Sequence, residues 1–252
     1  DFPENVLEEA LGVPPQVSEA EARAPDREDF RQLPIVTIDG ETAKDFDDAV
    51  HVARPPNAHY ELQVHIADVA HYVRRGSPLD REARLRGTSV YFPDRAVPML
   101  PEALSNGICS LNPQVERLVM SVVMEIDAHG KVLHARFTPG VIRSAARMTY
   151  TDVNKVLEGD PEMTVRYAAL AERFRLMKEL ALVLTAKRTR RGSIDFDLPE
   201  PIIEFDEFGR MVTIARSERN IAHRIIEEFM LAANEAVAGY LEKRGISSLH
   251  RV

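Results

Sequence analysis

The chain of 252 residues contains a single cysteine, Cys109, and no tryptophan. One cysteine excludes an internal disulfide and a zinc site built from several thiolates, because each needs at least two. It favours a reducing, cytoplasmic compartment. The sequence also has no apolar run of about 18 residues, the length that a transmembrane helix needs, so we predict no membrane partner.

Neither sign of charge dominates. The formal net charge is −8, from 40 acidic and 32 basic residues. This balance argues against a protein whose whole surface binds nucleic acid, but it permits a local basic channel. The hydrophobic fraction of 44% and the charged fraction of 29% are typical of a globular protein. Composition alone therefore leaves the function open.

Breaker residues divide the chain early. Residues 1–32 are rich in Glu, Pro and Ala, and we interpret them as a linker that carries one short helix at residues 5–11. From residue 33 the pattern changes to apolar runs and alternating segments. We therefore place the start of the folded domain there and extend it through residue 252.

Apolar periodicity predicts the elements of this domain. Strands are expected at 35–38, 49–52, 59–66 and 118–127, with hairpins over 118–139 and 201–216 and long helices over 162–190 and 219–243. Strands precede helices, with little alternation between them. An α+β fold is therefore favoured over a doubly wound parallel sheet.

Four aspartates fall within ten positions of the stretch TIDGETAKDFDDAV: Asp39, Asp45, Asp47 and Asp48. They lie between two predicted strands, so they gather at one end of a sheet. Carboxylates held this close repel one another unless a cation lies between them. Mg²⁺ prefers such oxygen ligands, and two ions about 3.5–4 Å apart are a known arrangement for phosphodiester chemistry.

Two other readings of the acidic stretch remain open. It can be a solvated acidic turn, although Phe46 inside it indicates a buried anchor. It can also be the DxD motif of a haloacid-type phosphatase, because Asp45 and Asp47 have the required spacing. That motif places its first aspartate directly after an apolar strand, whereas Thr42, Ala43 and Lys44 intervene here.

The acidic stretch resembles the signature of the RNB family of exoribonucleases, the ribonuclease II and ribonuclease R group. Further segments resemble ribonuclease R in the same order: HIADVAHYV (65–73), SPLDREARLRGTSVYFPDRAVPMLPEALSNGICSLNP (77–113), RMTYTDV (147–153), RGSIDFD (191–197) and AHRIIEEFMLAAN (222–234). The resemblance covers residues 33–252. It implies an RNB catalytic domain with a largely antiparallel, curved sheet packed by helices.

The resemblance implies Mg²⁺-dependent, processive degradation of single-stranded RNA from its 3′ end to nucleoside monophosphates. It implies that Asp39 and Asp48 are direct metal ligands and that Asp45 and Asp47 serve a second ion or orient the attacking water. It also implies that the C-terminal half of the domain lies outside these 252 residues, or is supplied by another chain. A non-catalytic, RNA-binding RNB-like module is the alternative.

Three further residues acquire RNA-binding roles from the resemblance alone. Tyr91 and Phe196 match aromatic residues that clamp the terminal base, and Glu228 matches a glutamate that contacts RNA near the active site. The plain alternatives are core aromatics for the first two and an ion pair with Arg224, one helical turn earlier, for Glu228. Arginines cluster at 74–86 and 186–192, where they are candidates to guide the phosphate backbone or are simply solvated.

Overall fold

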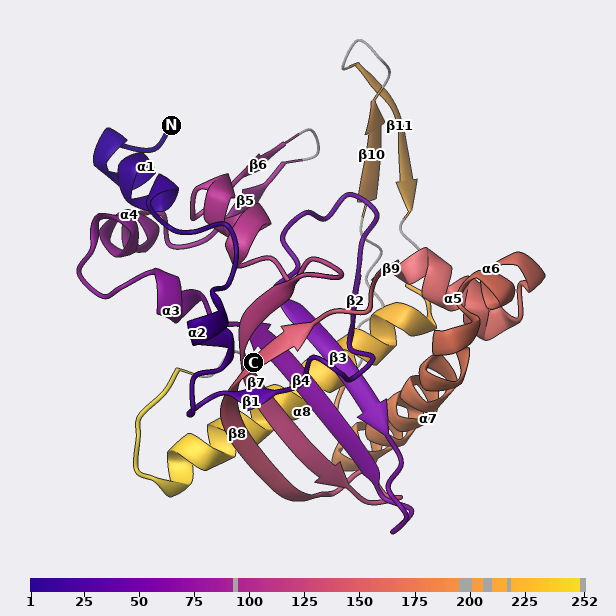
Figure 1. Cartoon of the computed structure of the whole chain (residues 1–252). Coiled ribbons are helices and arrows are strands. Elements are labelled where there is room, and N and C mark those ends of the chain that lie inside the picture. Colours follow the sequence, from indigo (N-terminus) through magenta and orange to yellow (C-terminus); the bar gives the residue numbers. More distant parts are fainter. Residues whose placement is uncertain (93–94, 195–200, 206–209, 217–218, 250–252) are drawn as a thin grey trace.

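The computed structural model describes residues 1–92, 95–194, 201–205, 210–216 and 219–249 (Figure 1). Within these residues a seven-stranded sheet forms the centre of the molecule, in the order β1-β8-β7-β4-β3-β2-β9. Its strands are β1 (Glu28–Asp29), β2 (Val36–Asp39), β3 (Asp48–Ala53), β4 (Tyr60–Ala67), β7 (Glu116–Ile126), β8 (Val132–Arg143) and β9 (Ala146–Thr149). Two small hairpins stand apart from it: β5 (Val90–Tyr91) with β6 (Ala96–Val97), and β10 (Pro201–Phe205) with β11 (Met211–Arg216).

Helices surround the sheet. They are α1 (Glu4–Leu11), α2 (Glu19–Ala22), α3 (Val69–Tyr72), α4 (Pro78–Arg86), the π-helical turn η1 (Ala103–Ile108), α5 (Tyr150–Glu158), α6 (Pro161–Arg166), α7 (Ala168–Arg191) and α8 (Ile221–Lys243). The long helices α7 and α8 lie across one face of the sheet (Figure 1). The predicted α+β class is confirmed. The sheet is largely antiparallel, with parallel pairing only of β1 with β8 and of β2 with β9.

The predicted long helix over 162–190 is two helices. The break falls at Tyr167, whose backbone leaves the helical region at φ −110° and ψ 29°. Its hydroxyl donates a hydrogen bond to Asp152 on α5, at 3.3 Å. Periodicity did not reveal this break because the apolar stripe resumes in α7, where Leu170, Phe174, Met177, Leu180 and Leu184 are buried as expected.

Both faces of the central strands are buried. On β4, Tyr60, Leu62 and Val64 pack under α7 and α8, as the alternation predicts, whereas Ile66, predicted on the same face, is exposed. Their neighbours Gln63 and His65, on the opposite face, are buried as well. An alternating pattern normally marks one solvated face. Here the second face is enclosed, because the sheet curls.

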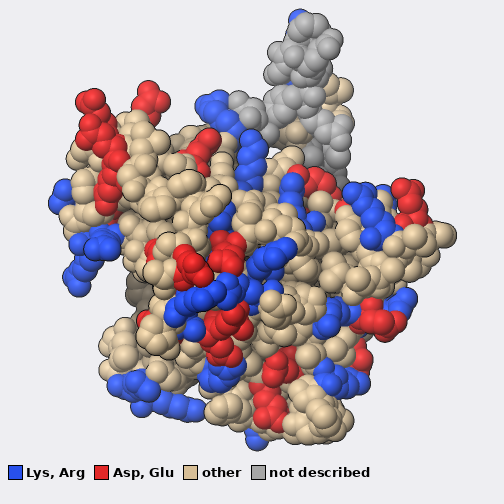
Figure 2. Space-filling view, viewed as in Figure 1, with Lys and Arg blue, Asp and Glu red and all other residues tan. Residues whose placement is uncertain are grey.

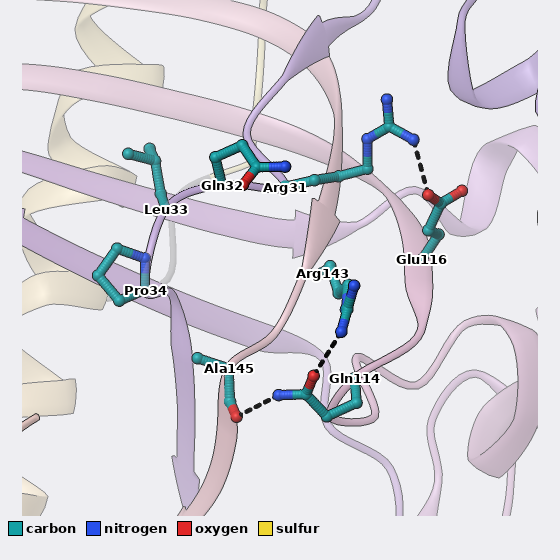
Figure 3. A pocket seen from close by; sticks show the side chains of 8 residues that line it. All are labelled: Arg31, Gln32, Leu33, Pro34, Gln114, Glu116, Arg143 and Ala145. Carbon is teal, nitrogen blue, oxygen red and sulfur yellow. Dashed lines mark hydrogen bonds and ion pairs between the residues drawn. The ribbon is translucent and has the colours of Figure 1, made fainter. Parts of the chain in front are cut away.

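The connection from β8 to β9 makes the curl visible. Only Ser144 and Ala145 separate the two strands, although β9 is one edge of the sheet and β8 lies near the other. Gln114 holds this short crossing. Its side chain donates to the Ala145 carbonyl at 2.7 Å and accepts from Arg143 at 2.8 Å (Figure 3).

The polar hollow of Figure 3 also contains Arg31, which pairs with Glu116 at 2.6 Å and with Asp29 at 2.7 Å. In this hollow Arg31 is therefore paired with carboxylates, and Arg143 with the side-chain amide of Gln114. We interpret this hollow as part of the seam that closes the curled sheet.

The N-terminal segment, expected to be a linker, packs against the domain. Helix α1 forms where predicted, with Val6 and Ala10 buried among residues near α4 and η1. Strand β1 joins β8, and Arg27 forms a nearly buried ion pair with Asp68 at 2.7 Å. The following Phe30 enters the enclosed face of the sheet, where its ring lies 4.9 Å from that of His65. The domain boundary at residue 33 stays a prediction.

Gly140 leaves the space that Phe30 occupies. A β-carbon at this position would lie 2.7 Å from Cε2 of Phe30. We expect Gly140→Ala to lower the free energy of unfolding by roughly 1–3 kcal/mol, because the ring must move within a packed core. Gly239→Ala is the matched control, since nothing lies within 4 Å of its added methyl, and it should be stabilising by roughly 0.5–1 kcal/mol. Urea unfolding of both variants checks the pair, and equal effects would contradict this role of Gly140.

Two buried histidines make stability depend on pH. Burial lowers the pKa of His51 to about 4 and that of His65 to about 3. The unfolded chain takes up these protons near pH 6.5, before the folded chain does. Stability should therefore be retained above pH 6.5 and fall toward pH 4, by up to about 1.4 kcal/mol per pH unit for each histidine. Urea unfolding at several pH values measures how the free energy of unfolding falls with pH. This dependence should be shallower than in the wild type for His51→Gln and unchanged for the exposed His129→Gln. An equal dependence in the wild type and both variants would refute this.

Candidate active site

The four predicted aspartates gather where β2 ends and β3 begins. Asp39 is the last residue of β2 and Asp48 the first of β3, while Asp45 and Asp47 lie on the loop between them. All four line one cavity of about 810 Å³. Strands β2 and β3 run antiparallel and pair at Val36 and Val50, so the end of β2 and the start of β3 lie at the same edge of the sheet. The predicted sheet-end position of the cluster is therefore the observed one.

The protein environment opposes ionisation of three of these carboxyl groups. Burial raises the pKa of Asp48 to about 6, and the charges of Asp39 and Asp47 add to the shift. The pKa of the half-buried Asp39 is raised chiefly by its burial, against a hydrogen bond from the Gly40 amide. Asp47 lies at an exposed position, yet partial desolvation and the charges of Asp45 and Asp39 raise its pKa too. A cation placed among them would relieve this strain.

The donor set fits a hard divalent ion, because it offers carboxylate oxygens and no thiolate. The side chains do not yet form an assembled centre. Among the described residues, no three Asp, Glu, His or Cys side chains converge as the ligands of a bound ion do. What the structure provides is a shared cavity with four aspartates in its lining, in which Lys44 and Arg95 offset part of the negative charge. Ligation would draw the carboxylates together.

An exposed tyrosine stands over the acidic loop. Tyr91, on the β5–β6 hairpin, is 66% exposed, and its hydroxyl donates a 2.5 Å hydrogen bond to Asp45. This bond is the main cause that raises the pKa of Tyr91 to about 12. Phe92 and Arg95 of the same hairpin also line the cavity. The core-aromatic alternative for Tyr91 is wrong, since a ring this exposed contributes little to a core.

A stacked pair that sequence reasoning missed lies beside the aspartates. Tyr150, which opens α5, stacks on His223 of α8 with ring centroids 3.9 Å apart. Burial raises the pKa of Tyr150, and the nearby charges of Asp39 and Asp48 add to it. Only the position of Tyr150 within RMTYTDV marked it in the sequence. The pair joins α5 and α8 next to the cavity.

Comparison with known proteins assigns the family. The model of the RNB domain matches residues 27–252. The chain is 50% identical over 252 residues to ribonuclease R 1 of Lactococcus lactis and 45% identical over 251 residues to ribonuclease R of Escherichia coli. The structure of Mycoplasma genitalium RNase R in complex with ribose methylated single-stranded RNA superimposes with a TM-score of 0.91 at 34% identity.

The chain belongs to the RNB domain family. All of it aligns with these proteins, and it spans 31% of the length of the two ribonucleases R and 39% of the M. genitalium chain. The resemblance stated from the motifs is thereby confirmed. So is the expected RNB fold of a largely antiparallel, curved sheet with packed helices.

Glu228 of this RNB domain is buried, at 2% exposure, within α8. It accepts hydrogen bonds from the Thr185 hydroxyl at 2.9 Å and from Nη2 of Arg188 at 2.9 Å. The alternative of an ion pair is therefore observed, but with a partner on α7 and not with Arg224. An RNA contact by Glu228 stays a prediction. The predicted base-clamp residue Phe196 lies outside the described residues.

The arginine clusters of the RNB domain are partly engaged within the protein. Arg86 packs on the ring of Phe2 and bonds to Glu82, and Arg191 pairs with Glu235. On the face shown in Figure 2, basic and acidic side chains alternate over short distances and form no single basic field.

Cys109 is buried, as expected, and burial raises the pKa of its thiol to about 12. No helix among the described residues has the length and apolar character to cross a membrane.

The electrostatic load at Asp48 predicts a stabilising substitution. Asp48→Asn keeps the shape of the side chain and removes one of the crowded charges. In EDTA at pH 7 we expect it to raise the free energy of unfolding of the RNB domain by roughly 1–2 kcal/mol, because the buried, ionised carboxylate of Asp48 destabilises the folded wild type. Added Mg²⁺ should stabilise the wild type and not the variant, as thermal unfolding would show. Asp26→Asn is the control for removing a charge elsewhere, and an equal gain there would contradict the explanation.

Proposed function

We propose that this RNB domain carries the active site of a Mg²⁺-dependent exoribonuclease that hydrolyses single-stranded RNA processively in the 3′ to 5′ direction and releases nucleoside 5′-monophosphates. The observation that carries the proposal is the single cavity that holds four aspartates beneath an exposed tyrosine. Carboxylates at one end of it suit metal-assisted hydrolysis, and the aromatic ring suits a base. Relatives of this chain named ribonuclease R support the assignment.

Asp39 and Asp48 are the proposed direct ligands of Mg²⁺, because the ends of two paired strands hold them on either side of the loop. Asp45 and Asp47 serve a second ion or orient the attacking water. When bound, the ions would neutralise phosphate charge and activate that water. Hydrolysis of a phosphodiester depends mostly on positioning and charge neutralisation, and a rigid sheet end provides the first of these.

Single-stranded RNA is the proposed partner, since the M. genitalium structure that resembles this chain contains such RNA. Tyr91 would stack on the terminal base, with Phe196 opposite and Glu228 near the chain. Stacking does not distinguish the bases, because each has an aromatic face. A base on Tyr91 would lie directly over the acidic loop, since the phenol already reaches Asp45. A base stacked on this ring would bring the 3′ end next to the carboxylates.

One observation favours a second candidate, a module that binds RNA without cleaving it. The described acidic side chains do not converge as ligands do. Retention of RNA in EDTA, with no cleavage when Mg²⁺ is added, is what this candidate predicts.

A gel assay with 5′-labelled single-stranded RNA tests the proposed function. With Mg²⁺ we expect the label to collapse into one short end product, because decay runs from the 3′ end, and we expect no reaction in EDTA. Asp48→Asn should abolish cleavage and retain RNA. Tyr91→Phe should cleave at a rate near the wild type, whereas Tyr91→Ala should weaken RNA binding by about 1–3 kcal/mol through lost stacking. A ladder of internal fragments, or cleavage by Asp48→Asn, would contradict the proposal.

A further inference from the structure

The loop between β2 and β3 has no regular secondary structure, yet its backbone is anchored from outside. The buried Ser110 hydroxyl accepts from the Phe46 amide at 3.0 Å and donates to the Lys44 carbonyl at 3.0 Å. The amide of Leu111 donates to the carbonyl of Phe46 at 2.8 Å. On this side, the loop is held by the segment that follows η1.

Arg147 holds the opposite side of the loop. Arg147 lies on β9, which pairs in parallel with β2. Asp39 is the last residue of β2, so Arg147 is on the strand next to it. Its Nη2 donates to the carbonyls of Glu41 at 2.7 Å and Ala43 at 3.2 Å. Its guanidinium carbon also lies 4.9 Å from the centroid of the Phe46 ring.

These contacts differ from those of an ordinary surface arginine. Exposed ion pairs contribute little, because both partners are well solvated and flexible. Arg147 is itself exposed, but it binds two backbone carbonyls and the face of a buried aromatic ring, so it holds the loop at three points. The charge of Arg147 also favours ionisation of the nearby Asp39 carboxyl group. One side chain thus shapes the loop and offsets its charge.

We propose that Arg147 is a positioning residue of the metal centre, which holds the β2–β3 loop so that its carboxylates face one cavity before any ion binds. The inference rests on the proposed function and adds a residue to it. Without Arg147, the carboxylates would repel one another and move apart. Part of the binding free energy of an ion would then be used to bring them together again. Partners in the shell around metal ligands typically change metal affinity by about 10–100-fold when removed.

Two measurements on the full chain test this. The first is a Mn²⁺ titration followed by electron paramagnetic resonance, and the second is deuterium uptake of the peptide that spans residues 40–48 in EDTA. Arg147→Met should raise the dissociation constant for Mn²⁺ by about tenfold or more and speed uptake in the loop. Arg147→Lys should recover part of both, because an ammonium can still reach one carbonyl. The matched control is Arg166→Met, whose guanidinium also lies over a ring, that of Tyr167, and which should behave as the wild type.

The outcomes separate this inference from the proposed function. If Asp48→Asn loses Mn²⁺ while Arg147→Met, folded by circular dichroism, binds it within about twofold of the wild type, the positioning role is overturned and the metal centre stands. An equal loss in Arg166→Met would also overturn the positioning role. If the wild type and Asp48→Asn bind Mn²⁺ alike, the metal centre fails, and the role of Arg147 in it fails too.

Discussion

Mutual repulsion among four carboxylates is the constraint on which the rest of this structure depends. Asp39, Asp45, Asp47 and Asp48 share one cavity, and burial, with the charges of Asp39 and Asp47 added to it, raises the pKa of Asp48 to about 6. Such crowding is unfavourable, and it persists in a folded chain only where the backbone that carries it cannot relax. Carboxylates that are held together before a cation arrives also bind it well, because the cation relieves their repulsion. The site therefore requires a frame stiff enough to hold like charges together.

The curled sheet is that frame. Strands β2 and β3 are interior to its order, and each acidic end is paired on its outer side, Asp39 with Thr149 of β9 and Asp48 with Ile66 of β4. The short crossing at Ser144 and Ala145 returns the chain from β8 to β9, which delivers Arg147 to the acidic loop. Phe30 fills the enclosed face from the N-terminal segment, where Gly140 leaves room for its ring. Features far from the aspartates thus fix their positions.

Two attachments make the cavity more than an acidic pocket. The β5–β6 hairpin carries Tyr91 to Asp45, so an aromatic surface and a carboxylate surface meet. The α5 and α8 termini meet at the Tyr150–His223 stack, on the side of Asp39 and Asp48. A substrate with both flat bases and charged phosphates matches such a composite lining. This match is the physical reason for which we propose RNA and not a small phosphate ester.

The sequence by itself determined the local elements and the place of the acidic cluster. Alternation marked β4, the apolar stripes marked α7 and α8, and the spacing of the aspartates placed them at a sheet end, because each of these depends only on near neighbours along the chain. The tertiary structure alone decided the rest. It paired Glu228 with Arg188 and not with Arg224, enclosed His51 and His65, and packed the N-terminal segment on the domain. These outcomes depend on which distant segments meet when the sheet curls, and periodicity carries no record of such contacts.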